Sequence, residues 1–207
     1  MYQGILGGLS GKIGNVVGSS WKGIPVLKTK PLSVANPQTA AQIAQRDKME
    51  AIMFYALPVL ATLIKPLWDR FASKMSGINA FISDNIAYFT SVNELIPASI
   101  RISSGKGAAV AIDSVDATNG QKSVQFIWTP NGGTGFALDT DEMYAMVINI
   151  DNTESAAQHT ITTRVSGSIE VDLPSNVTTG DRLYCYLGAR RADGTVIFDS
   201  SYLLKTV

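Results

Sequence analysis

The sequence is poor in the residue types on which most enzyme chemistry depends. Its 207 residues include one histidine, His159, and one cysteine, Cys185. A serine or cysteine nucleophile usually needs a histidine base beside it, and a lone cysteine cannot form a disulfide within the chain. Because His159 stands in the polar stretch Ala157-Gln158-His159-Thr160, we expect it in a surface loop. Cys185 lies in an apolar strand pattern, which predicts a buried, inert thiol. We therefore predict that the chain is not an enzyme.

Charge and long apolar runs are also scarce. Charged residues make up 16% of the chain, against about a quarter in ordinary proteins, and 17 basic residues balance 17 acidic ones. The low content of charged residues fits a surface that a partner covers. It fits equally a compact β-rich domain whose surface is made of Ser, Thr, Asn and Gly. Without a basic run, we predict no nucleic-acid partner. The longest apolar stretch, residues 58–68, is broken by Lys65 and is too short to span a bilayer. We expect no membrane contact and synthesis in the cytoplasm without export.

Two short motifs suggest ligand binding but fail on spacing. Gly11-Lys12 follows earlier glycines, yet Gly7 is one position too close for a phosphate-binding loop and Ile13 has no hydroxyl for magnesium. Asp139, Asp141 and Glu142 lack the ligand spacing of a calcium loop, so they predict a solvated loop before a strand. We therefore expect no metal, no cofactor and no small-molecule ligand.

Glycine spacing sets the N-terminal residues 1–35 apart. Glycines stand at positions 4, 7, 8, 11, 14, 18 and 23, a density that penalises a helix. Residues 12–17 and 24–30 are predicted to be extended, with a turn at 18–20, as an arm or β-hairpin. So short a ribbon is marginal alone, and we expect it to pack on the chain's own helices or on a neighbouring subunit.

Residues 36–96 are predicted to be a short helical segment. Asn36-Pro37 is a favourable start, because Asn caps helices and Pro suits the first helical position. Proline and glycine breaks divide the segment into helices near 37–57, 59–75 and 78–90. An apolar stripe on these helices is expected to face the core; it consists of Phe54, Leu57, Leu60, Ile64, Leu67, Trp68 and Phe71.

Residues 97–207 change to alternating β-branched, aromatic and polar residues, which indicates strands. The predicted strands are 107–113, 122–128, 143–150, 160–166, 168–173, 181–190 and 196–205. Asp193-Gly194 between two apolar strands is a strong hairpin signal. About seven short strands in roughly 110 residues fit an immunoglobulin- or fibronectin-like sandwich. Trp128 is the expected core aromatic, and Tyr184 is a candidate tyrosine-corner residue.

The fold class is therefore predicted as α+β: an extended arm or hairpin, a helical segment, and an antiparallel β-sandwich. Residues 8–23, G-L-S-G-K-I-G-N-V-V-G-S-S-W-K-G, resemble the opening of an uncharacterised family of Bacteroidota bacteria and their phages. The resemblance continues through Asn36-Pro37 to Gln42 and ends at Asp199-Ser200-Ser201-Tyr202. It implies a shared architecture and association with phage genes, and it carries no catalytic residues.

The candidate site is the arm motif, whose glycines permit close backbone approach and whose polar and aromatic residues can anchor it. Its residues are Gly8, Gly11, Lys12, Gly14, Asn15, Gly18, Trp21, Lys22, Gly23, Asn36, Pro37 and Gln42. We expect a phage virion protein (capsid-associated, connector or tail) that binds copies of itself and other virion proteins through this arm. The alternative is a module that binds protein or glycan through the sandwich loops. The expected location is the virion, or otherwise the bacterial cytoplasm.

Overall fold

The computed structural model describes residues 11–21, 24–31, 33, 37–70, 72–158 and 160–207. The chain divides into two compact units, Met1–Thr39 and Ala40–Val207. We call the first the arm unit and the second the body. The fold is α+β with antiparallel sheets and a β-sandwich in the body, as the sequence predicts.

The arm unit contains three antiparallel strands where the sequence predicted two. Strands β1 (Gly11–Ile13), β2 (Val16–Trp21) and β3 (Ile24–Thr29) pair in that order. The first turn is Gly14-Asn15, because Ile13 pairs with Val16 and Gly14 has a φ of 59°, a conformation typical of two-residue hairpin turns. The predicted turn at residues 18–20 is wrong, since these residues lie inside β2 and pair with β3.

The body begins with a helical layer that is shorter and more broken than predicted. Helix α1 (Ala40–Ala56) starts three residues after Pro37, directly behind Thr39. A π-helical turn, Leu60–Ile64, leads into α2 (Lys65–Trp68), and α3 (Gly77–Asn85) continues as a 3-10 turn, Ile86–Tyr88. The predicted helix 59–75 therefore ends early. The end of 78–90 is a strand, because β4 (Phe89–Ser91) pairs with β5 (Glu94–Leu95).

The predicted apolar stripe is only partly buried. Ile64 and Leu67 are buried, whereas Phe54 and Leu57 are exposed, and Phe71 lies outside the described residues. Pro58 and the π-helical turn interrupt the regular helix between α1 and α2, so the two helices do not share one continuous face. A single helical repeat carried through the whole segment therefore does not identify which of its side chains are buried.

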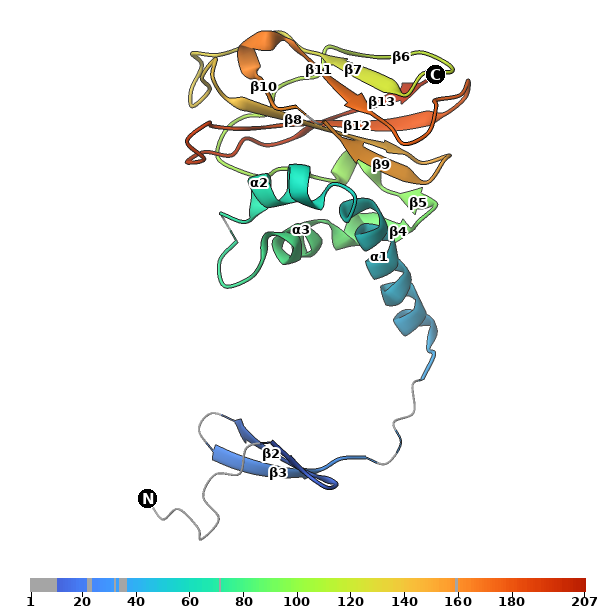
Figure 1. Ribbon diagram of the computed structural model, residues 1–207, viewed down its shortest axis with the longest axis vertical. Coiled ribbons are helices and arrows are strands. Elements are labelled where there is room, and N and C mark those ends of the chain that lie inside the picture. Colours follow the sequence, from blue (N-terminus) through green and yellow to red (C-terminus); the bar gives the residue numbers. More distant parts are fainter. Residues whose placement is uncertain (1–10, 22–23, 32, 34–36, 71, 159) are drawn as a thin grey trace. The chain divides into compact units, whose positions relative to one another are not determined.

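The sandwich consists of a three-stranded and a five-stranded sheet (Figure 1). The smaller sheet orders the strands β11-β7-β6, and in the larger one β8 pairs with β12 on one edge and with β9 and β10 on the other, while β13 follows β12. The strand bounds are β6 (Ser114–Ala117), β7 (Ser123–Ile127), β8 (Glu142–Asn149), β9 (Glu154–Ala157), β10 (Thr162–Thr163), β11 (Ser168–Asp172), β12 (Arg182–Arg190) and β13 (Ser201–Thr206).

The strand predictions fail in two places. Residues 107–113 form no strand; Gly107 makes a single bridge to Phe198, and the first strand is β6. Residues 160–166 hold the two-residue β10 and a 3-10 turn, Arg164–Ser166, whereas the strand β9 was not predicted. Its sequence, Glu-Ser-Ala-Ala, has neither β-branched nor aromatic residues, so it forms a strand through pairing with β8.

Other sequence signals are confirmed. Gly194 has a φ of 69° in the hairpin before β13, and its amide donates to Arg191 O at 2.7 Å. Trp128 is buried and its Nε1–H donates to Arg164 O at 2.9 Å. The tyrosine-corner prediction for Tyr184 is not confirmed: the β12 hydroxyl that donates to a carbonyl is that of Tyr186, to Pro97 O at 3.0 Å, whereas the Tyr184 ring lies beside Tyr202.

The five-stranded sheet is buried on both faces. Met143, Ala145 and Val147 of β8 belong to the core between the two sheets. The alternate residues Tyr144 and Met146 belong to a second core, formed with the helices. The body therefore has three layers, helices, five-stranded sheet and three-stranded sheet, with the larger sheet in the middle (Figure 1).

Because both cores share one sheet, we predict that the helices and the sandwich unfold together. Replacing the fully buried Leu63 with alanine removes packing from the helical core and is expected to cost about 2–5 kcal/mol of unfolding free energy. Far-ultraviolet and near-ultraviolet circular dichroism should then show one transition, shifted as a whole. Leu204→Ala, at a half-exposed leucine of β13, is the control and should shift it little. Two separate transitions, of which Leu63→Ala moves only one, would contradict the shared core.

Candidate functional site

Among the described residues of the arm sheet, no hydrophobic side chain is fully buried. Cross-strand pairs place Ile13, Val16 and Leu27 on one face, because Ile13 lies opposite Val16 and Leu27 lies opposite Gly18, two residues further along β2. These three side chains are exposed by 65%, 40% and 60%. A small sheet normally gains its stability from an apolar face packed on something else. We call this set of side chains the arm apolar face.

The structure brings part of the predicted motif together. Gly11 and Lys12 lie in β1, Gly14-Asn15 form the turn, and Gly18 and Trp21 lie in β2. Gly11 pairs directly with Gly18, which leaves the sheet without side chains beside Leu27.

The remaining motif residues do not join this sheet. Pro37 is an exposed residue before α1, and Gln42 is in the first turn of α1, in the body. Gly8, Lys22, Gly23 and Asn36 lie outside the described residues. Pro37 therefore does not occupy the first helical position that the sequence predicted.

Charge is divided unequally between the two units. Residues 1–39 contain four lysines and neither aspartate nor glutamate, which leaves 13 basic and 17 acidic residues in 40–207. The overall neutrality of the chain therefore conceals an arm unit of charge +4 and a body of charge −4. Opposite charges on two surfaces favour their encounter and orient it.

The acidic cluster before β8 is built into the fold, and the prediction of a solvated loop is wrong for two of its members. Asp141 is fully buried and pairs with the equally buried Arg164 at 3.0 Å, while Glu142 pairs with Arg190. Arg164 also donates to Asn131 Oδ1 at 2.7 Å and stacks over the Phe198 ring. No sequence pattern marks Arg164 as a buried cation. The cluster closes one end of the sandwich.

Removing one partner of this pair should destabilise the body strongly. Arg164→Met leaves the Asp141 carboxylate buried without its cation, which typically costs about 3–5 kcal/mol. Arg182→Met is the matched control, because Arg182 pairs with Asp151 on the surface and exposed pairs contribute little. Urea denaturation of both variants measures the difference. Equal midpoints would contradict a structural role for the buried pair.

The sequence singled out two further residues for chemistry, Cys185 and His159. Cys185 is buried, as predicted, and His159 lies outside the described residues. Within the described part of the chain, no group of three or more His, Cys, Asp or Glu side chains is placed to hold a metal ion.

Burial raises the pKa of the Cys185 thiol to about 12, so the reactive thiolate is scarce at and below pH 9. We predict that a thiol reagent such as DTNB leaves the folded chain unlabelled between pH 7 and pH 9, and labels one thiol per chain in urea. Rapid labelling of the folded chain that rises through this pH range would contradict the burial of Cys185.

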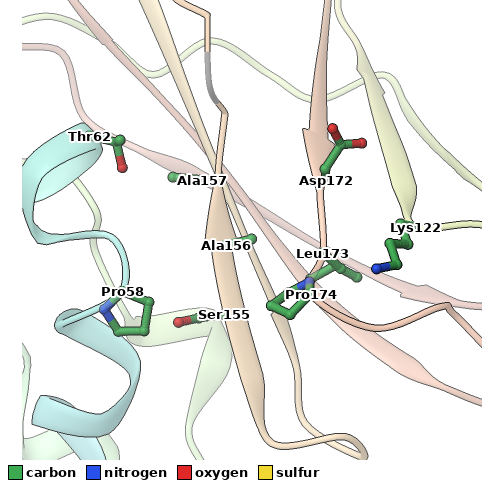
Figure 2. Close-up of a pocket in the computed structure, with 9 residues that line it drawn as sticks. All are labelled: Pro58, Thr62, Lys122, Ser155, Ala156, Ala157, Asp172, Leu173 and Pro174. Carbon is green, nitrogen blue, oxygen red and sulfur yellow. The ribbon is translucent and has the colours of Figure 1, made fainter.

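One hollow of the body is an open groove of about 640 Å³. Pro58 and Thr62 line its helical side, and residues 155–157 of β9 run along it (Figure 2). The opposite side is formed by Lys122, Asp172, Leu173 and Pro174. Lys122 and Asp172 are its ionisable side chains. The other lining residues are proline, alanine, leucine, serine and threonine.

Comparison with known proteins places the chain in a family. A family model described as a family of unknown function, DUF6266, matches residues 8–204. The chain belongs to this family. The match starts at Gly8, the first glycine of the arm motif, and spans both the arm unit and the body. No curated protein matches the chain.

Within the described residues, no single helix is long and apolar enough to cross a membrane. Ala40–Ala56 and Leu60–Trp68 reach that length and composition only together, as a pair bent by 79°.

Proposed function

We propose that this member of the DUF6266 family is a non-enzymatic assembly protein whose arm unit makes contacts between subunits. The observation that carries the proposal is the arm apolar face, since Ile13, Val16 and Leu27 are exposed on one side of the arm sheet. Exposed apolar surface of this kind marks interaction sites. The positive arm unit and the negative body of a second copy are electrostatically suited to such contacts.

The assembly is proposed to be a phage particle, in which the chain is a capsid-associated, connector or tail component. The support is the resemblance of residues 8–23 to a family of Bacteroidota bacteria and their phages. The partners are other copies of the chain and other particle proteins, with no part for nucleic acid or a membrane. The location that follows is the virion, after synthesis in the host cytoplasm. Quantitative mass spectrometry of purified particles is expected to find the chain at a fixed copy number, and its absence would contradict this assignment.

The arm contacts are tested by self-association of the purified chain. Full-length protein is expected to form oligomers in sedimentation velocity experiments, whereas residues 40–207 should remain monomeric. Leu27→Lys places a charge on the arm apolar face and should weaken association about tenfold or more. Leu204→Lys, the same change at a half-exposed leucine of the body, is the matched control and should leave association unchanged. Full-length protein that stays monomeric at all concentrations, alone and with particle proteins, would overturn the proposal.

A second candidate function is recognition of protein or glycan by the sandwich loops. It has one specific observation in its favour: Phe136 is exposed by 55% and lines a hollow of about 330 Å³ with Asn131 and Thr134. An exposed aromatic ring beside polar groups is typical of such sites. Binding on a glycan array that Phe136→Ala abolishes would support this function over assembly.

A further inference from the structure

One side of the sandwich carries two strand edges that no other strand covers within the described part of the chain. In the larger sheet β9 pairs with β8, and in the smaller sheet β11 pairs with β7. Free backbone donors and acceptors at such an edge are a template for a further strand.

The backbone hydrogen bonds identify which groups of β9 are free. The Gln158 amide donates to Ala145 O at 3.4 Å. In an antiparallel ladder hydrogen-bonded pairs alternate, so Ala156 and Glu154 are the β9 residues bonded to β8. Ser155 and Ala157, which are exposed by only 5% and 7%, therefore direct their N–H and C=O groups away from β8.

The groove described above runs along this edge (Figure 2). Its lining includes three consecutive residues of β9, 155–157. Successive side chains of a strand point to opposite faces of the sheet. A hollow lined by three consecutive residues therefore lies at the edge of the strand rather than on one face. A second hollow of about 280 Å³ shares Asp172 and continues the opening to Thr160 and Thr162.

The arm strand β3 has a matching free edge. The Lys30 amide donates to Asn15 O at 2.7 Å, so the alternation directs Lys28 and Val26 toward β2. Leu27 and Thr29 then present free N–H and C=O groups on the other side. Pro25 follows on the same edge and has no N–H, which limits pairing to these two residues. Two outward residues of β3 thus match two outward residues of β9.

We propose that β3 of one copy adds to the free edge of β9 in a second copy, so that the groove is the receptor for a neighbour's arm. This inference rests on the assembly function proposed above and names its docking site. Strand addition to an exposed sheet edge is an established way to bind an extended segment. Asp172 complements the lysines of the arm, and it lines the groove together with Lys122. Glu154 of β9, next to the groove residue Ser155, has one carboxylate oxygen that is buried without a hydrogen-bond partner in the described residues.

Disulfide trapping between two different variants tests the proposal. Lys28 lies between Leu27 and Thr29, and Ala156 lies between Ser155 and Ala157. The two are therefore directly opposite each other when the two edges pair antiparallel. Lys28→Cys protein mixed with Ala156→Cys protein and oxidised is expected to yield a cross-linked dimer. Cys185 remains in place because it is buried. The matched control mixes Lys28→Cys with Gln125→Cys, an exposed site on β7, and should yield far less dimer.

Charge reversal supplies a second readout that needs no cysteine. Asp172→Lys is expected to weaken self-association about tenfold, and adding Lys28→Asp to it should restore part of the loss. Asp116→Lys, the same change at an exposed site on β6, is the control and should have little effect.

The outcomes separate this proposal from the assembly function. One outcome is oligomers that depend on the arm and yet give no disulfide at Ala156→Cys and no response to Asp172→Lys. That result would overturn the groove as receptor and leave the assembly function standing. A disulfide that forms only within the Lys28→Cys/Ala156→Cys double variant, as a monomer, would overturn docking between copies. A chain that never associates would overturn both.

Discussion

Strands β8 and β12 carry two alternating sets of buried side chains, so the sheet that they form has to be covered from both sides. One cover is the three-stranded sheet, which completes the sandwich. The other is the helical layer, which is tied to the sheet by Ser155 Oγ–H donating to Tyr55 O at 2.8 Å and by Tyr186 donating to Pro97 O. Residues 40–207 consequently form one compact unit. The helices do not stand between the arm and the sandwich as a separate domain.

The arm unit presents the opposite situation. Its three strands pair with one another, yet Ile13, Val16 and Leu27 remain exposed. The same unit holds four lysines and neither aspartate nor glutamate, so no acidic side chain of the unit balances their charge. The body has an excess of acidic residues and an open groove beside a free strand edge. The arm unit has exposed apolar side chains and positive charge, and the body has a groove and negative charge. This complementarity is the physical basis of the assembly that we propose.

Much of the fold could be predicted from sequence, and the misses have physical causes. Alternating β-branched residues and the Asp193-Gly194 turn indicated most of the sandwich. The strand β9 was missed because small residues form it only through pairing with β8. Arg164 was missed because the cation becomes buried by a partner, Asp141, that is 23 residues away in sequence. In the arm, the glycines indicated extended structure, but the turn was misplaced because Gly18 pairs across to Gly11, a contact that local composition does not encode.

The central claim is that association covers an arm sheet that is uncovered in a single copy. Amide hydrogen exchange of residues 11–29, followed by mass spectrometry from dilute to concentrated full-length protein, tests it most directly. We predict that protection of the arm amides rises with protein concentration, while β8 and β12 stay protected throughout because both faces of their sheet are buried. Arm amides equally protected at every concentration would contradict the claim, because the arm would then be covered within its own chain.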